Sequence, residues 1–415
     1  MRSFWRFALL SVTVSAPGVA MADPATDWWE IASRFNLAQQ SSAMPSPPET
    51  QRASSRTALA VFEAVNAIDR RYQTYLDFPA ATSEASQDAA AATAAHRVLL
   101  HHYPQNKPIL DESHAMAMAL IADGPLKEAG VAIGEQAAQA VIAARGIDPA
   151  IEQQPYRPRT SPGEWIGGAL PSLEPYWVAF TPWVAEREEL ISPPPPALTS
   201  ETWARDYEEV RRLGERTSQE RSPVQTLIAR YRQGYDLSPM VRYIADRPGR
   251  RQVDNARLFA LYQIAMDDAV QAMIVSKLRY NFWRPITAIR NGDRDGNEAT
   301  QPAPAWVPLL PTPNFPEYPC GHCTAVAVQT EVLKLAGGLP DSTPVRIASG
   351  MNPNLVLQSV RSWEEAVAQV SDSRMYGGVH YRFSNDAGEE IGRRAARRTV
   401  ETILRPLPQQ ARRRR

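Results

Sequence analysis

The chain has 415 residues, with 45 lysines and arginines and 45 aspartates and glutamates, so its formal net charge is zero. A balanced charge provides no general attraction for nucleic acid, and we expect no nucleic-acid partner. The basic tail at 406–415 is an exception, and a solvated chain end explains it better than a binding patch. The length is sufficient for a large core and for two domains.

The first 22 residues have the pattern of a secretory signal peptide. Arg2 and Arg6 precede a mostly apolar run at 7–20, and an A-x-A cleavage pattern ends at Ala22. A membrane anchor is the alternative, but the run falls short of the ~20 residues that a span needs. No other window is apolar enough to cross a bilayer. We therefore expect an exported protein, periplasmic or secreted, without a stable membrane span.

Apolar residues recur at spacings of three and four along much of the chain, as on one face of an α-helix. Alternating patterns with hairpin turns, which indicate strands, are nearly absent. The sequence therefore predicts an all-α protein built of helical bundles. In chain order, the segments with a helical pattern or a helix-favouring composition are 58–68, 89–100, 131–144, 224–231, 258–282, 324–336 and 387–404.

Prolines, of which there are 36, divide this helical pattern. The densest cluster lies in a proline-rich segment at 181–200, which we interpret as a linker. It separates an N-terminal helical half (23–180) from a C-terminal half (201–405). The stretch 291–319, which contains many prolines, predicts a long loop that crosses the surface and returns to the region of the motifs described next.

Lys277 and Arg284 stand seven residues apart, which is two helical turns. On a continuous helix both side chains would leave the same face. The surrounding residues are strongly apolar, which favours a buried pair of cations with an anionic partner over two surface charges. Pro285 is expected to end or kink the helix directly after Arg284.

Two further motifs add cations, imidazoles and a helix start. The string PCGH at 319–322 precedes a helical pattern, so its amides should lie at a helix N-terminus, where an anion is favoured, and Gly321 allows close approach. Arg374 and His380 are separated by a glycine pair that permits a turn. An arginine can bind two oxygens, and an imidazole can bond a metal or attack phosphorus. Three converging cations require a multiply charged anion, so the sequence indicates an oxyanion enzyme.

These motifs resemble those of the vanadium-dependent haloperoxidases and of the related bacterial acid phosphatases and type 2 phosphatidic acid phosphatases. The family signature is K-x6-RP, PSGH and SR-x5-H, and the chain has matching segments at 277–285, 319–322 and 373–380. The longer strings at 306–322 and 373–383 are closer to the haloperoxidase branch. The resemblance covers most of the mature chain and implies two four-helix bundles.

The resemblance also implies roles for individual residues. His380 would be the covalent ligand of vanadium and the metal-binding residue, His322 would act as acid and base, and Lys277 would polarise the bound peroxide. The substrates would be hydrogen peroxide and a halide, which gives a hypohalous acid equivalent, with a small organic acceptor as a further candidate. The cofactor would be vanadate. The expected oxyanion-binding residues are Lys277, Arg284, Cys320, Gly321 and Arg374.

Two aromatic residues near the motifs, Trp283 and Phe315, are candidates for the lining of a halide pocket. In the family, the position of Phe315 is Phe in a chloroperoxidase and His in bromoperoxidases, which favours the former. An aspartate that orients Arg374 or His322 is also expected, and Asp372 is adjacent in sequence.

The chain departs from the family at Cys320, where the family has serine. With Cys323 it could close into a disulfide in an oxidising compartment. The same pair suggests a thiol–disulfide oxidoreductase, but that activity expects a thioredoxin-like setting that the helical pattern lacks. Two more hypotheses stay open. The same residues could hydrolyse a phosphoester through a phosphohistidine, or the chain could keep the scaffold without turnover.

Overall fold

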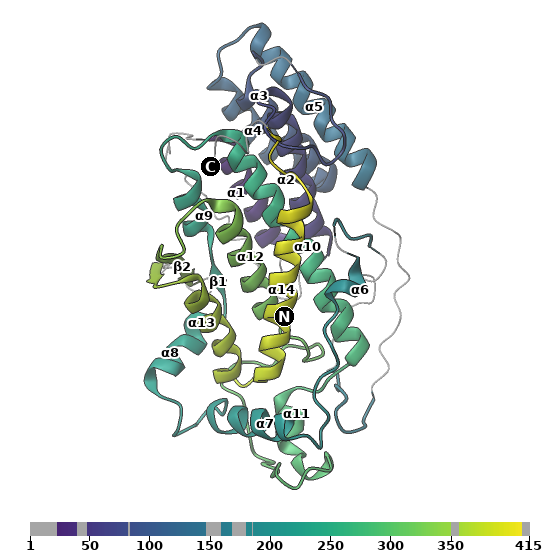
Figure 1. The fold of residues 1–415 in the computed structure, drawn as a ribbon, viewed down its shortest axis with the longest axis vertical. Helices are drawn as coiled ribbons and strands as arrows, with labels where there is room; N and C mark the ends of the chain where they lie inside the picture. Colours follow the sequence, from purple (N-terminus) through teal and green to yellow (C-terminus); the bar gives the residue numbers. More distant parts are fainter. Residues whose placement is uncertain are drawn as a thin grey trace, which may run out of the picture.

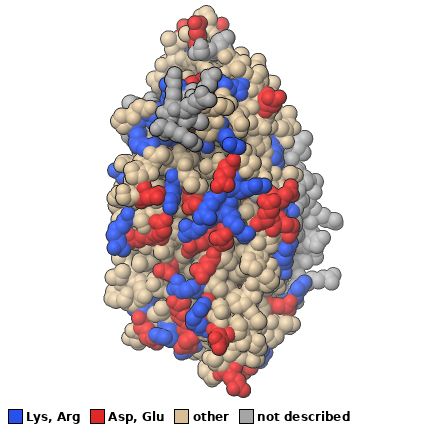
Figure 2. All heavy atoms as spheres, in the orientation of Figure 1, with Lys and Arg blue, Asp and Glu red and all other residues tan. Residues whose placement is uncertain are grey.

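The computed structural model describes residues 23–39, 48–81, 84–146, 159–167, 180–184, 186–349 and 357–408. The predicted signal peptide and the end of the basic tail lie outside the described residues. Basic and acidic side chains are interspersed over the face shown in Figure 2, as expected from the balanced composition.

The N-terminal helices form one bundle (Figure 1). Its close packing depends on small residues, because an added Cβ at Gly130 would lie 2.4 Å from the Ser86 oxygen and one at Gly134 would lie 2.5 Å from the Ala90 oxygen. The alanine-rich helix at 89–100 predicted from sequence is confirmed as part of α3. The helices are α1 (Pro24–Gln39), α2 (Pro48–Ile68), α3 (Gln87–His102), α4 (Lys107–Ala119) and α5 (Pro125–Arg145).

The C-terminal helices form a second bundle, and α10 belongs to both, because it packs against α2 as well as against α12 and α14. Added Cβ atoms at Gly388 and Gly392 of α14 would lie 2.4 and 2.5 Å from the carbonyl oxygens of Cys320 and Thr324. These glycines allow α14 to approach the start of α12. The helices are α10 (Gln252–Tyr280), α12 (Gly321–Gly337), α13 (Trp363–Tyr376) and α14 (Arg382–Thr402).

The helix α10 corrects one expectation from the sequence. By length and composition it is apolar enough to cross a membrane, although no such window was expected beyond the leader. In the structure 94% of its most apolar window is buried. Its composition is therefore explained by burial between the two bundles, which share one continuous hydrophobic core.

Shorter elements connect the bundles and surround one end of the second (Figure 1). Three strands form a small antiparallel sheet in the order β1-β2-β3, with Tyr235 opposite Ser349 and Val345 opposite Val360. The all-α prediction is confirmed, with this sheet as a minor addition. Among the described residues the short helices are α6 (Arg187–Leu190), α7 (Glu201–Leu213), α8 (Pro223–Tyr231), α9 (Ser238–Ala245) and α11 (Pro285–Arg290), with 3-10 turns at Pro104–Asn106 and Gly292–Arg294. The strands are β1 (Tyr235–Asp236), β2 (Val345–Ser349) and β3 (Leu357–Val360). A domain boundary in the proline-rich segment stays a prediction.

Candidate oxyanion site

Lys277 and Arg284 do not lie on one helix, which corrects the interpretation of their spacing. The helix α10 ends at Tyr280, and Asn281 caps it in the left-handed conformation with a φ of 45°. Arg284 is the N-cap of the next helix, α11, whose first residue is Pro285. Proline has no N–H to donate and its φ suits the first helical position, so it starts a new helix here. Both cations are nevertheless buried, at 1% exposure each.

The Lys277 ammonium group is held by the loop that precedes α12. Nζ donates to the carbonyl oxygens of Pro316 (3.1 Å), Glu317 (2.7 Å) and Pro319 (2.5 Å). An ammonium has three donors, so these bonds account for all of them. Burial lowers the pKa of Lys277 well below its usual value. In this arrangement Lys277 fixes the loop and has no N–H left over for an oxyanion.

Arg284 contacts the same loop and the third motif. Its Nε donates to the Phe315 oxygen (2.9 Å), and its Nη1 lies 2.8 Å from the Val379 oxygen and 3.2 Å from Nε2 of His380. Its Nη2 is buried without a hydrogen-bond partner among the described residues. Burial, with a contribution from the nearby charge of Arg374, lowers the pKa of Arg284 to about 9.

Arg374 lies in the last turn of α13 and is 3% exposed. Its Nε and Nη1 are buried, and neither has a hydrogen-bond partner in the described part of the chain. Burial lowers the pKa of Arg374 to about 10. After α13 the chain turns at Gly378, whose φ of 73° suits glycine, and reaches His380 as predicted.

His380 contacts a buried carboxylate that the sequence analysis did not single out. Its Nδ1 lies 2.6 Å from Oε1 of Glu317, which also accepts from the Tyr381 amide at 3.2 Å. Burial raises the pKa of Glu317 to about 7 and lowers that of His380 well below its usual value. Asp372, the expected orienting carboxylate, instead bonds Arg382 at 3.2 Å. The signal in the sequence that could have indicated Glu317 is its acidic side chain within a proline-rich string, three positions before Cys320.

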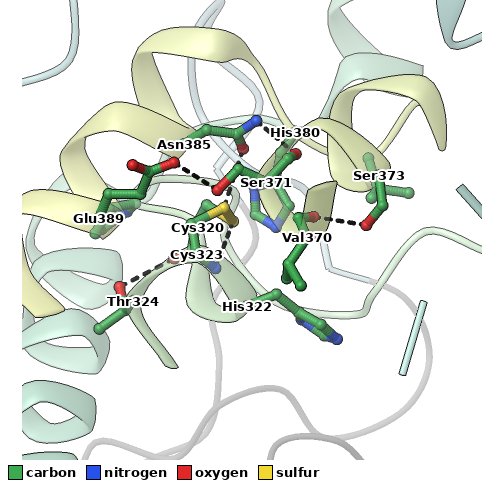
Figure 3. Close-up of a disulfide and its surroundings, with 12 residues drawn as sticks. Cys320, His322, Cys323, Thr324, Val370, Ser371, Ser373, His380, Asn385 and Glu389 are labelled. Atoms are coloured by element: carbon green, nitrogen blue, oxygen red, sulfur yellow. Dashed lines mark hydrogen bonds between the residues drawn. A yellow bond between two sulfur atoms is a disulfide. The ribbon is translucent and has the colours of Figure 1, made fainter. Parts of the chain in front are cut away.

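The start of α12 is closed by a disulfide between Cys320 and Cys323, both fully buried (Figure 3). Cys320 is the N-cap, and its sulfur accepts from the Cys323 amide at 3.2 Å. A disulfide sulfur has no hydrogen to donate, so the Cys320 side chain does not replace the donor hydroxyl of a serine. The helix begins at Gly321, three residues before the predicted segment, so the amides of this motif lie at a helix N-terminus as expected and lack helical acceptors. A Cβ added at Gly321 would meet only the side chain of Met273, at 3.4 Å, which is ordinary van der Waals contact.

His322 lies in the first turn of α12 and points away from the disulfide (Figure 3). Its Nε2 is 3.0 Å from the Gln233 carbonyl oxygen, and its ring approaches that of Tyr235 at 6.5 Å between centroids. Since a carbonyl only accepts, Nε2 carries the hydrogen and Nδ1 carries the lone pair. Burial, with the nearby charge of Arg374, lowers the pKa of His322 to about 3.

The two candidate pocket residues have different surroundings. Phe315 is half-buried, with Lys277 Nζ at 5.3 Å and the Arg284 guanidinium at 4.7 Å from its ring centroid, so it lies at the site. Trp283 stacks on Trp203 at 5.9 Å and belongs to an aromatic cluster. That cluster consists of Trp203, Tyr207, Phe282, Trp283, Tyr318, Tyr381 and Phe383, together with Val210, Ala288, Ile289, Trp306 and Met375.

The composition of the site fits a tetrahedral oxyanion. Buried guanidinium N–H groups of Arg284 and Arg374 have no protein partner among the described residues, and Gly321 is the first residue of a helix, a position that favours anions. Burial, with further contributions from the neighbouring cations, lowers the pKa values of Arg284 and of both histidines, and an anion would offset the repulsion between these groups. The fold and the site together define a helical-bundle protein with a buried oxyanion site.

Residues 257–408, which contain all three motifs, match the family model of the VCPO second helical-bundle domain. The likeness to this family model covers the C-terminal part of the chain, which holds the three motifs. A search of curated proteins finds vanadium chloroperoxidase of Curvularia inaequalis, 28% identical over 180 residues. That match covers 33% of this chain and 29% of the relative, so the chain spans less than a third of the relative's length.

Solved structures extend the likeness to nearly the whole chain. The crystal structure of the first bacterial vanadium-dependent iodoperoxidase covers 92% of this chain and 96% of its own, with a TM-score of 0.72 and 22% identity. The holo-type bacterial vanadium-dependent chloroperoxidase covers 89% of this chain and 96% of its own, with a TM-score of 0.66 and 18% identity. At this level of identity the likeness establishes the fold.

Proposed function

We propose that this protein is a vanadate-dependent haloperoxidase, which oxidises a halide with hydrogen peroxide to a hypohalous acid equivalent. The observation that carries the proposal is the group of buried N–H donors of Arg284 and Arg374 that have no partner among the described residues, together with His380 Nε2, which lies 3.2 Å from Nη1 of Arg284. These groups suit an oxyanion that is also bound by one nitrogen ligand. Support comes from the relatives, which are named as vanadium peroxidases. Vanadate is the proposed cofactor.

Each residue of the site would make a different contact with vanadate. Arg284 and Arg374 would donate to its oxygens and offset its charge, and the Gly321 amide would donate to another oxygen. His380 would bind vanadium through Nε2. When bound, vanadate activates hydrogen peroxide toward attack by a halide. Lys277 contributes its positive charge, while its N–H groups hold the adjoining loop in place.

His322 would move a proton at this site. Its pKa of about 3 keeps the imidazole neutral at ordinary pH, and the bond of Nε2 to Gln233 leaves the lone pair on Nδ1. Nδ1 can therefore accept a proton from incoming hydrogen peroxide and return it to the oxygen that leaves as water. The tautomer is assigned from the hydrogen-bond partner.

Export to the periplasm or the exterior is part of the proposal. It rests on the sequence of residues 1–22, and the disulfide supports it because such bonds persist in oxidising compartments. Both sulfurs are fully buried, which argues against a thiol–disulfide oxidoreductase, since exchange requires access to a sulfur.

The test uses mature protein that has been stripped of metal and phosphate and then titrated with orthovanadate. Halogenation of dimedone by peroxide is followed with chloride, bromide and iodide, and phosphoester hydrolysis is followed in parallel. Halogenation that rises with vanadate and falls with added phosphate is the expected result. Hydrolysis that vanadate inhibits, without halogenation by any halide, would show a phosphatase instead.

A pair of histidine variants controls for general damage. His380→Gln is expected to abolish halogenation and vanadate binding. His96→Gln changes another buried histidine, which bonds Asp111 at 2.9 Å in the N-terminal bundle, and should retain both. Normal activity in the His380 variant would refute its assigned role.

A further inference from the structure

Glu317 is a fully buried residue whose carboxylate makes hydrogen bonds to the third motif. Its Oε1 accepts from the Tyr381 amide at 3.2 Å and faces Nδ1 of His380 at 2.6 Å. At the other side of the same ring, Nη1 of Arg284 lies 3.2 Å from Nε2. A guanidinium can only donate, so Nε2 must accept and carries no hydrogen. The hydrogen of the neutral ring is therefore on Nδ1, where the Glu317 carboxylate receives it.

The backbone holds this carboxylate in place. The Glu317 amide donates to the Phe282 oxygen at 2.8 Å, and its carbonyl accepts from Lys277 Nζ at 2.7 Å. The same ammonium also bonds the carbonyls of Pro316 and Pro319. All three donors of Lys277 are thus directed to one short loop, and the direction of the carboxylate is set by that loop.

We infer that Glu317 is the positioning residue of His380, which fixes the imidazole with its hydrogen on Nδ1 and its Nε2 lone pair on the side of Arg284, where the oxyanion would bind. This inference deepens the proposed function and rests on it for the identity of the ligand. Histidines that bind metals commonly donate their other N–H to a carboxylate or carbonyl, which sets the tautomer and makes the ligand more basic. Glu317 would supply that second contact here.

A purely structural role must be distinguished from this one. Glu317 also lies near the positive charges of Arg284 and Lys277, so its removal could simply destabilise the protein. Glu63 offers a matched control in the N-terminal bundle. It is also fully buried, and its Oε1 accepts from the amides of Tyr75 (2.7 Å) and Leu76 (3.1 Å). Glu63→Gln should therefore reproduce the loss of a buried carboxylate without touching His380.

The first measurement leaves Glu317 unchanged. In mature protein labelled with ¹⁵N-histidine and stripped of phosphate, the ring nitrogens of His380 are assigned by comparison with His380→Gln. We expect a protonated Nδ1 and an unprotonated Nε2. A hydrogen on Nε2, or a rapidly exchanging mixture, would overturn the inference. This result does not depend on whether the protein turns out to be a peroxidase.

The second measurement is the affinity for orthovanadate, by calorimetry without peroxide or halide. Glu317→Gln keeps an acceptor oxygen but loses the charge, so affinity should fall about 10- to 100-fold while Nδ1 stays protonated. Glu317→Met removes the acceptor, so affinity should fall further and the tautomer should become mixed. Glu63→Gln should bind with the affinity of the parent. Parental affinity in both Glu317 variants would refute the inference.

A third outcome separates this inference from the proposed function. If the parent protein binds no vanadate but shows the expected ¹⁵N pattern, the proposed cofactor is wrong and the role of Glu317 in fixing the tautomer is retained. Inorganic phosphate is then used as the probe for the same variants, with the same order of affinities expected.

Discussion

Replacement of Arg374 by methionine is expected to stabilise protein stripped of phosphate and vanadate, and to abolish its anion binding. Arg374 is 3% exposed, and two of its guanidinium nitrogens have no hydrogen-bond partner among the described residues. A buried charge of this kind costs free energy that its ligand, and not the protein, offsets. Methionine has a similar length and no polar group to satisfy.

The size of the effect follows from the pKa of Arg374, which burial lowers from 12.5 to about 10. At roughly 1.4 kcal/mol for each tenfold change in proton affinity, the cost is about 3 kcal/mol. Imperfect packing of the smaller side chain should remove about 1 kcal/mol of this gain. We therefore expect a net stabilisation of about 1–2 kcal/mol, which corresponds to a rise of a few degrees in Tm.

The assay is thermal unfolding of parent and variant, with and without orthovanadate or phosphate. The anions should raise the Tm of the parent and leave that of Arg374→Met unchanged. Arg221→Met is the control, because Arg221 is also buried but donates to the oxygens of Leu213 (2.6 Å), Glu215 (2.6 Å) and Thr226 (3.0 Å). Its replacement should destabilise the protein by about 1–3 kcal/mol. A comparable loss of stability in Arg374→Met would refute the reasoning.

Three further predictions concern other parts of the molecule. Gly321→Ala should fold with a Tm close to that of the parent, since its Cβ meets only a flexible methionine at 3.4 Å, but calorimetry should show weaker vanadate binding; unchanged binding would contradict the assigned oxyanion contact. Cys323→Ser leaves Cys320 as a free thiol beside the oxidant, so halogenation should decay during turnover. Mass spectrometry should then show oxidation of Cys320, whereas the variant with serine at both positions should stay active. Burial lowers the pKa of His114 from 6.5 to about 4, so its contribution to stability is present above pH 6.5 and is lost as pH falls through 4. The denaturant midpoint should therefore fall less over this pH range in His114→Gln than in the parent. An identical fall in both proteins would exclude His114 as the cause.

The sequence predicts the long helices well because burial of one helix face makes apolar residues recur at spacings of three and four. The α14 segment is identified in this way, whereas α10 is buried on nearly all sides and has no single apolar face. The glycine pair after Arg374 correctly indicates a turn. The break after Lys277 was missed because a seven-residue spacing is also compatible with one helix. Asn281 in the left-handed conformation ends α10, and this backbone state is common for asparagine yet not required by it.

The sequence predicted which cations and histidines form the site, but only part of how they contact one another. Motif spacing identified the cations and histidines, because each motif is local in the chain. The partner of His380 was missed because a carboxylate 63 positions away in sequence can be assigned only when the loop path is known. Likewise, the sequence could not show that three backbone carbonyls engage Lys277, since any residue type supplies a carbonyl.

The shared helix α10 has a consequence for cooperativity. Its N-terminal part packs within the first bundle, and its last turn carries Lys277, which holds the loop at the oxyanion site. Neither bundle can lose its structure without exposing the apolar surface of this helix. The two bundles should therefore unfold together, and an anion bound at the far end of α10 would slow the opening of α2 as well. Anion binding and the stability of the N-terminal bundle should therefore be coupled through the helix α10.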